Sequence, residues 1–289
     1  MKRIISLILF LTLVLSLSAC GKVEITMQEI YNAVQTEAML KNHQSVYVQN
    51  EMDGEIWCER YMTKDYVFTH IPSEESDWAE FMTDDARYCD VTEGNLLYLY
   101  ITPDGVSNFA SERADKYTSF ILGEDALDQT IESVSEKDGR ITVTSILSQK
   151  NLEAMVEDGV TAGKFEYVLD AKTREVISIT SDYTFTDGTS YQDVTKISYD
   201  AETPEMLKTF LAYQSQTENL RNITVVSNPG TEKEETKSIQ APKGLIIGFE
   251  YDDTLEGAVG FYTDAACTQN YDPFGDTDSD LTIYVKWTE

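Results

Sequence analysis

The chain has 289 residues, of which 51 are Asp or Glu and 22 are Lys or Arg, and its formal net charge at pH 7 is −29. A surface this acidic is repelled by phosphate backbones and by anionic lipid headgroups, which argues against nucleic acid as a partner. The hydrophobic fraction of 42%, with 15 Gly and 6 Pro, argues against a largely disordered chain, and the length is enough for one large domain or two modest ones. We expect two.

The N-terminus carries an export signal. Lys2 and Arg3 precede an apolar run from Ile4 to Leu17, which has the length of a signal-peptide core and is too short to span a bilayer comfortably. An ordinary secretory signal and an N-terminal membrane helix are the alternatives. The charges of Lys22 and Glu24 count against the helix.

The segment Leu17-Ser18-Ala19-Cys20-Gly21 resembles the processing site of bacterial lipoproteins. In such proteins cleavage leaves the cysteine as the mature N-terminus, and the cysteine carries diacylglycerol. The resemblance implies that Cys20 is the lipid-attachment site and that the lipid holds the protein on the extracytoplasmic face of the cell membrane. Removal of residues 1–19, which include Lys2 and Arg3, changes the net charge from −29 to −31.

A helix is expected directly after the tether. Thr26-Met27-Gln28-Glu29 has the pattern of a capping box, in which the Thr26 hydroxyl and the Glu29 carboxylate satisfy free amide groups at a helix start. Apolar residues near helical spacing predict that this helix continues to about Asn42 with one buried stripe.

From Ser45 the period of the apolar residues changes to two, which predicts strands around 46–48, 56–61 and 66–68. The stretch from Pro72 to Asp85 is rich in acidic residues and is expected to be a long loop or a short helix. Residues 96–101 are apolar on both faces, which is typical of a covered strand.

The middle of the chain predicts two helices and four strands. The helices are expected at 112–122 and 151–158. Residues 136–139 are expected to close a hairpin into a strand at 141–147. Three alternating strands are expected at 165–169, 177–185 and 191–199, followed by a short helix at 205–213 and a polar linker at 214–222.

This order of elements resembles the half-barrel superfamily of lipoprotein carriers, which includes the periplasmic lipoprotein carrier and related lipid-binding lipoproteins. The likeness covers roughly Ile25 to Tyr213 and rests on one N-terminal helix, a large antiparallel meander and two hairpin signals. The first signal is Tyr167, Leu169, Asp170 and Thr173, and the second leads through Asp187-Gly188 to Tyr199-Asp200. The resemblance implies a curved sheet and lid helices around an apolar cavity.

Under this resemblance, aromatic and aliphatic residues at strand spacing are candidates to line the cavity. The candidate ligand-binding residues are Trp57, Tyr61, Tyr66, Phe68, Leu97 and Leu99. The alternative is a filled core, because apolar stripes at this spacing are most often simple packing.

The C-terminal residues resemble one internalin-type β-grasp repeat. The likeness rests on Gly260-Phe261-Tyr262-Thr263-Asp264, on Ala266-Cys267-Thr268, on Tyr271-Asp272 and on the last strand, Asp280 to Trp287. Phe261 stands where such repeats commonly have Trp. The fold class expected for the whole chain is therefore α+β: an antiparallel half-barrel sheet with a long N-terminal helix and lid helices, plus a small β-grasp-like domain. The expected divisions are 1–19 signal peptide, 20–24 lipidated tether, 25–213 half-barrel, 214–222 linker and 223–289 β-grasp-like domain.

Three cysteines remain besides Cys20. A disulfide between Cys58 and Cys89 is expected if their strands are neighbours, and unpaired half-buried thiols are the alternative. Cys267 has no assigned partner. No Cys-Xaa-Xaa-Cys pair or Cys/His cluster has zinc spacing, so we expect no metal site.

The sequence offers little for catalysis. His43 and His70 have no partner motif, and surface or capping roles are expected for both. Asp276, Asp278 and Asp280 alternate as calcium ligands do, but the Gly and the distant Glu of a helix-loop-helix calcium site are missing. We expect no catalytic residues, no cofactor and no enzyme, with a hydrolase as the least favoured class.

Together these patterns predict a lipid-anchored extracytoplasmic protein that binds or carries a hydrophobic ligand, a lipid or an acyl chain, in a half-barrel cavity. The alternative is a cell-envelope interaction or structural module that binds a protein or a wall polymer and has no ligand cavity. A persistent apolar cavity would indicate the carrier. A packed core with an exposed apolar patch would indicate the module.

Overall fold

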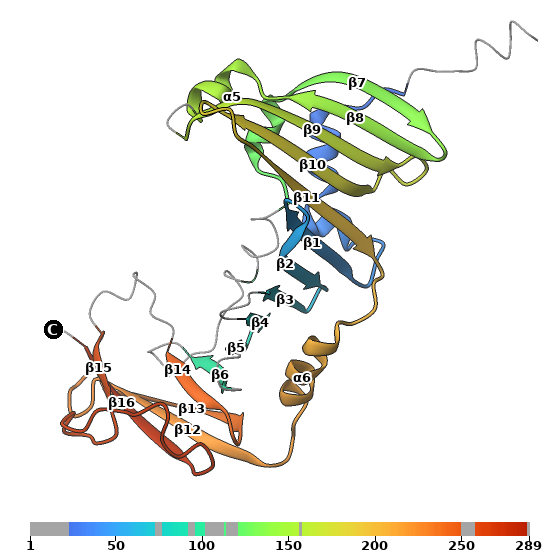
Figure 1. Ribbon diagram of the computed structural model, residues 1–289. Helices are drawn as coiled ribbons and strands as arrows, with labels where there is room; N and C mark the ends of the chain where they lie inside the picture. The colour runs from blue at the N-terminus through green and yellow to red at the C-terminus, as the bar shows by residue number, and fades with distance from the viewer. Residues whose placement is uncertain are drawn as a thin grey trace, which may run out of the picture. The chain divides into compact units, whose positions relative to one another are not determined.

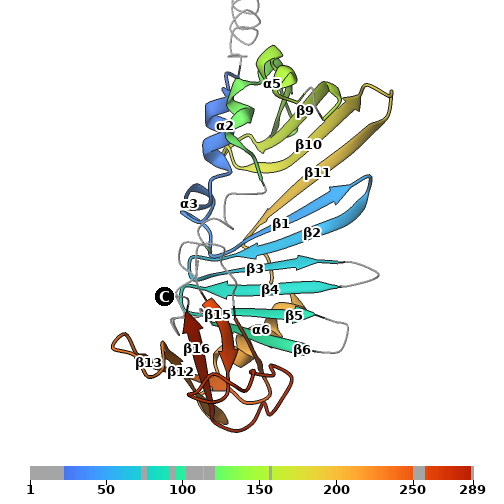
Figure 2. The same cartoon turned by 90° about the vertical axis from the view of Figure 1, so that its left-hand side faces the viewer.

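The computed structural model describes residues 23–72, 77–91, 96–101, 113, 121–155, 158–249 and 258–287 (Figures 1 and 2). These residues are mostly in β-strands, with short helices. The chain separates into two compact units, the first made of 1–33 and 124–190 and the second of 34–123 and 191–289. The expected linker at 214–222 lies inside the second unit, and a domain division at that linker stays a prediction. Cys20 and most of the helix expected at 112–122 lie outside the described residues.

The first unit holds a four-stranded antiparallel sheet in the order β10-β9-β8-β7. Its elements are α2 (Met27–Ala33), η1 (Glu124–Asp128), β7 (Thr130–Lys137), β8 (Arg140–Ile146), α5 (Gln149–Ala154), β9 (Val160–Asp170) and β10 (Val176–Phe185). Alternate residues of β8 and β9 are buried, Ile141 and Val143 among them, as period-two patterning requires. Asp138 and Gly139 both have positive φ, which the tight hairpin between β7 and β8 needs.

The N-terminal helix begins as the sequence predicts and ends much earlier. The Thr26 amide donates to Glu29 Oε2 at 2.7 Å and the Glu29 amide donates to Thr26 Oγ1 at 3.2 Å, which confirms the capping box. The expected continuous helix to Asn42 is wrong. Gln35 is extended, with ψ of 136°, and it separates α2 from a second short helix, α3 (Thr36–Met39). α2 buries Met27 and Ile30, and α3 buries Thr36 and Met39, so the spacing of buried residues continues across the break.

The second unit holds a larger sheet in the order β14-β6-β5-β4-β3-β2-β1-β11 (Figures 1 and 2). Its strands are β1 (Val46–Met52), β2 (Glu55–Met62), β3 (Tyr66–Ile71), β4 (Trp78–Thr83), β5 (Arg87–Val91), β6 (Leu96–Ile101), β11 (Ser190–Tyr199) and β14 (Ile246–Phe249). Neighbours are antiparallel except β14, which lies parallel to β6. The strand β4 falls where the sequence predicts a loop or a helix. Residues 79–83 are all buried, so they lack the alternation that marks a half-exposed strand.

One face of this sheet carries an aromatic core. One row of paired residues crosses the sheet on one face: Tyr47, Tyr61, Phe68, Phe81, Tyr88, Leu99 and Ile247. The helix α6 (Glu205–Gln214) packs on this face, where the ring centroid of Phe210 lies 5.8 Å from that of Phe68 and 6.0 Å from that of Phe81. This face therefore has a filled aromatic core.

The C-terminal part forms a four-stranded mixed sheet in the order β13-β12-β16-β15. Its strands are β12 (Leu220–Ser227), β13 (Glu235–Pro242), β15 (Ala258–Tyr262) and β16 (Leu281–Trp287), and β12 runs parallel to β16. Arg221 is 2% exposed and donates to the carbonyls of Asp276, Ser279 and Leu245, which secures the loop before β16. The described residues of 223–287 include no helix, and the β-grasp assignment stays a prediction.

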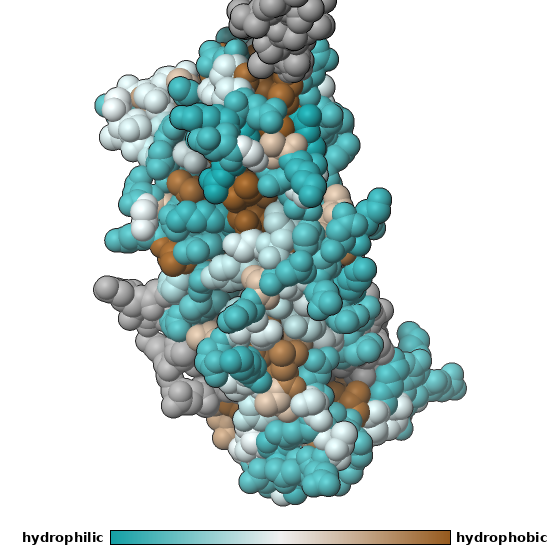
Figure 3. Space-filling model, turned by 90° about the vertical axis from the view of Figure 1, so that its right-hand side faces the viewer, coloured by the Kyte–Doolittle hydropathy of each residue, from teal (hydrophilic) through white to brown (hydrophobic). Residues whose placement is uncertain are grey.

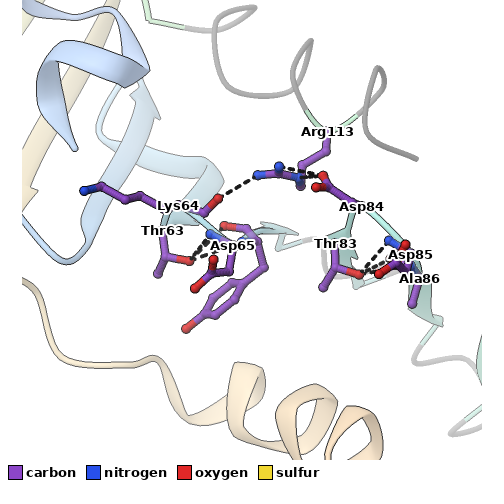
Figure 4. Close-up of polar contacts among 9 residues, drawn as sticks. Thr63, Lys64, Asp65, Thr83, Asp84, Asp85, Ala86 and Arg113 are labelled. Carbon is purple, nitrogen blue, oxygen red and sulfur yellow. Dashed lines mark hydrogen bonds and ion pairs between the residues drawn. The ribbon is translucent and has the colours of Figure 1, made fainter. Parts of the chain in front are cut away.

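Two hairpin turns of the large sheet share one local design (Figure 4). In each turn a threonine hydroxyl, of Thr63 or of Thr83, accepts hydrogen bonds from the amides two and three residues ahead. Arg113 connects the two turns, because its guanidinium donates to Asp84 Oδ1 at 2.5 Å and to the Lys64 carbonyl at 3.1 Å.

The expected disulfide between Cys58 and Cys89 is wrong. The two residues are buried cysteines that form no disulfide, on β2 and β5, and β3 and β4 lie between those strands. Three strand spacings separate them by about 14 Å, whereas a bridge needs Cα atoms within about 7 Å. No helix among the described residues is long and apolar enough to cross a membrane.

Candidate functional site

The candidate site is an open cleft of about 370 Å³ on the aromatic face of the large sheet. We call it the sheet cleft. Strands β1, β2 and β3 form its floor with Tyr47, Glu59, Phe68 and His70, and the segment from β11 into α6 forms its wall. The wall residues are Ala201, Glu202, Pro204, Glu205 and Met206. The cleft therefore combines two aromatic rings and a thioether with three carboxylates and an imidazole.

A chain of hydrogen bonds runs along the floor of the sheet cleft. The Tyr47 hydroxyl donates to Glu59 Oε1, and the other oxygen of Glu59 lies 2.8 Å from His70 Nδ1. His70 Nε2 lies 2.7 Å from Asp77 Oδ1. Since ionised carboxylates only accept hydrogen bonds, both ring nitrogens of His70 donate, and the imidazole is the protonated form.

The pKa values along this chain follow from the same contacts. The hydrogen bond with Glu59 raises the pKa of His70 above its ordinary value of 6.5, against the effect of burial. The hydrogen bond from His70 lowers the pKa of Glu59 below 4.5. Burial, together with its bond to Glu59, raises the pKa of Tyr47, which stays protonated. Glu59 and the His70 imidazolium balance each other in charge at the cleft floor, and Asp77 holds the far nitrogen of the ring.

The structure brings together four of the six residues expected to bind a ligand. Tyr61, Phe68 and Leu99 are buried in the aromatic core under α6, and Tyr66 packs against that core. Of the six, Phe68 also lines the sheet cleft. Trp57 lies at a β-bulge, where its indole nitrogen is 3.3 Å from Asp193 Oδ1. Leu97 lies in β6, and its side chain is outside the described residues.

Glu59, His70 and Tyr47 were not expected to act as a group. His70 is within β3 and pairs directly with Glu59 across the hairpin. The signal was present in the alternation, because Glu59 is two residues before Tyr61 and His70 is two residues after Phe68. A hairpin centred between Lys64 and Asp65 places both pairs opposite each other. The cross-strand register was therefore the missing information.

A second polar group lies on the opposite face of the same strands. Glu80 is 1% exposed and Arg60 is 2% exposed. Glu80 Oε1 accepts a hydrogen bond from Arg87 Nε at 2.6 Å and from the Cys89 thiol at 3.8 Å. We call Arg60, Glu80 and Arg87 the buried ionic cluster.

Other candidate residues have structural partners. His43 Nδ1 lies 2.8 Å from Asp200 Oδ2. Asp276 and Asp280 accept hydrogen bonds from backbone amides of Asp278 and Asn222, respectively, which are ordinary loop contacts. Among the described residues, no group of three or more His, Cys, Asp or Glu could hold a metal ion.

No protein-family model matches the chain, and no curated protein matches its sequence. The solved structures that are similar to it include the lipoprotein LppX of Mycobacterium tuberculosis, at 9% identity and a TM-score of 0.36, covering 62% of this chain and 96% of that one. A LolA-superfamily protein from Nitrosomonas europaea is 9% identical with a TM-score of 0.23, covering 64% and 97%. The Pseudomonas aeruginosa MucA/MucB complex is 13% identical with a TM-score of 0.26, covering 82% and 83%.

Proposed function

We propose that this chain is a lipid-anchored protein of the extracytoplasmic face of the cell membrane and that it binds a hydrophobic or amphiphilic ligand in the sheet cleft. The observation that carries the proposal is the composition of that cleft, which places Phe68, Met206 and the Tyr47 ring beside a connected polar chain. Small-molecule sites are mostly apolar clefts of about 300–1,000 Å³ with a few placed polar groups. The anchor would be the lipid on Cys20.

The size and charge of the cleft restrict the ligand. At about 370 Å³ the cleft is near the lower end of that range, so it suits one short apolar chain or one ring system and not a whole diacyl lipid. Among the cleft carboxylates Glu59 is paired with His70 and Glu205 with Lys208. The charge of Glu202 therefore favours a neutral or cationic head group over an anionic one, because like charges repel.

The same geometry supports binding without catalysis. Both nitrogens of His70 are held by carboxylates, so the imidazole has no free nitrogen to accept a proton from a substrate. The Tyr47 hydroxyl also stays protonated. The polar chain is therefore suited to orienting a ligand.

The test fills the sheet cleft and compares the result with a matched control. The C20S chain, which cannot take the lipid, is purified without detergent and studied by native mass spectrometry with dodecyltrimethylammonium below its micelle concentration. A201W introduces a large ring at the cleft wall, whereas A212W introduces the same ring at an exposed position of α6. We expect the parent and A212W to bind the amphiphile and A201W to lose it. Equal binding by both variants, or no binding by the parent, would contradict the proposal.

A second function is favoured by a different observation. The aromatic core is filled, and Met52, Ile56 and Ile71 are 46%, 40% and 39% exposed at one end of strands β1, β2 and β3. Figure 3 shows separate apolar patches on a mostly hydrophilic surface. These features suit a cell-envelope module that contacts a protein or a wall polymer. A parent chain that stays free of amphiphile in the same experiment would favour this function.

A further inference from the structure

A second cleft, of about 460 Å³, lies in the C-terminal four-stranded sheet and is separate in composition from the sheet cleft. We call it the lysine cleft. Strands β12 and β16 are parallel, so both end at the same edge of the sheet, at Ser227 and Trp287. The loop after β12 and the loop between β15 and β16 meet the end of β16 there.

The charge of the lysine cleft is opposite to that of the chain. In the described part of the chain, its lining has Lys233 and Lys286 against one carboxylate, Glu232, in a protein whose net charge is −29. Among the described residues, neither ammonium group has an ion-pair partner. Burial raises the pKa of the Cys267 thiol, against the effect of Lys286, so the thiol stays neutral at pH 7 and adds no negative charge.

The apolar part of the lysine cleft is supplied by Trp287 together with Pro229 and two alanines. The indole N–H of Trp287 is buried and has no hydrogen-bond acceptor within the described part of the chain. A buried donor without an acceptor is unfavourable.

From this lining we infer that the lysine cleft binds a small organic carboxylate with a flat apolar body. The carboxylate would lie between the two ammonium groups, and the apolar body would pack on the Trp287 ring. A long polyanion is disfavoured because the rest of the acidic chain repels it. The carboxylate belongs either to a free small molecule or to the C-terminus of a peptide, since both present the same chemistry.

The experiment uses two probes that differ only in charge. N-acetylphenylalanine carries a carboxylate, and N-acetylphenylalanine amide is its neutral analogue. The ¹⁵N-labelled C20S chain has three tryptophans, and the indole signal of Trp287 is assigned by its loss in W287F. We expect the carboxylate to shift this signal saturably and the amide to bind roughly tenfold more weakly, a difference of about 1.4 kcal/mol.

Matched variants locate the effect. K286Q removes one ammonium group from the lysine cleft and should weaken binding of the carboxylate roughly two- to fivefold. K172Q makes the same change in the exposed turn between β9 and β10 and should leave it unchanged. Equal binding of both probes, no shift with either probe, or equal effects of K286Q and K172Q would overturn the inference.

A third probe, a short peptide, distinguishes the two sources of the carboxylate. The tripeptide Gly-Gly-Phe with a free C-terminus is compared with N-acetylphenylalanine. Tighter binding of the tripeptide identifies a peptide terminus as the ligand, and weaker binding identifies a free small carboxylate. The A201W variant should bind both probes normally, because the lysine cleft shares no lining residue with the sheet cleft.

Discussion

The two faces of strands β2 to β5 carry two charged groups that differ in exposure. On one face His70 and Glu59 have side chains that are 16% and 24% exposed at the floor of the sheet cleft. On the other face the side chain of Glu80 is 2% exposed and Arg60 is also buried, while Arg87, which pairs with Glu80, is 17% exposed. Successive residues of one strand, such as Glu59 and Arg60 of β2, thus have different surroundings, because their side chains point to opposite faces of the sheet.

The difference in exposure separates charged groups that stabilise the fold from charged groups that a ligand could reach. A buried ion pair depends on its partner, and its disruption is strongly destabilising because an uncompensated charge remains inside. A partly exposed group can exchange its partner for water or for a ligand at lower cost. We therefore assign the buried ionic cluster to the fold and the His70 chain to binding.

The largest effect is expected from E80Q. The amide keeps the shape of the carboxylate but removes its charge, which leaves Arg60 and Arg87 without their common counter-charge. We expect the free energy of unfolding to fall by about 3–5 kcal/mol, measured by urea denaturation. The matched change E59Q on the cleft face should lower it by about 1–2 kcal/mol. If E59Q is the more destabilising of the two, the assignment of the faces is wrong.

A smaller effect that depends on pH is expected from H70Q. This change removes the imidazolium that two carboxylates hold, and we expect a loss of about 1–3 kcal/mol at about pH 5.5. Because the pKa of folded His70 is raised above 6.5, its contribution is complete below about pH 6.5 and is lost as the pH rises through the folded value.

Glu59 titrates in the opposite direction. Its pKa is lowered below 4.5 on folding, so its contribution is complete above about pH 4.5 and is lost as the pH falls through the folded value. The difference in unfolding free energy between the parent and H70Q should therefore be largest between about pH 4.5 and 6.5. A difference that grows from pH 6 to pH 9 would show that His70 is neutral in the folded protein.

The turns at the ends of these strands allow a test away from both faces. R113M removes the hydrogen bonds to Asp84 and to the Lys64 carbonyl, and we expect a loss of about 1–2 kcal/mol in thermal or urea unfolding. K64M changes the exposed side chain and keeps the carbonyl, so its effect should stay within about 0.5 kcal/mol. Equal losses would show that the side chain of Lys64 matters and that the Arg113 contact does not.

The smallest effect on the free energy of unfolding is expected for two tyrosines, Tyr47 and Tyr61, which pair across the neighbouring strands β1 and β2. Y47F removes a hydrogen bond to Glu59, and Y61F removes one to the Ala201 carbonyl. Both should lower the unfolding free energy by about 0.5–1.5 kcal/mol. Only Y47F should raise the pKa of Glu59, because the Tyr47 hydroxyl stabilises its ionised form. The pKa of Glu59 is measured by NMR titration of its side-chain carbon, and an unchanged value in Y47F would remove Tyr47 from the polar chain.

Local patterns were sufficient for most single elements. Alternation predicted β1 and the strands β9 to β11, and a run that is apolar on both faces predicted β6. Turn residues such as Asp138-Gly139 predicted hairpins that the structure confirms. These signals depend on a few adjacent residues, so no long-range information is needed. The same reasoning failed for β4, which is buried on both faces, and for the helix that breaks at Gln35.

The site required information that no local pattern contains. Glu59 and His70 meet because of the hairpin register, and the wall of the sheet cleft comes from residues 201–206, more than a hundred positions away. The parallel pairing of β14 with β6 joins segments equally distant in sequence. Composition and local pattern were enough for the acidic character, the expected anchor at Cys20 and most strands. Which charges are buried and which line a cleft follows only from the folded chain, because burial depends on what packs over each face.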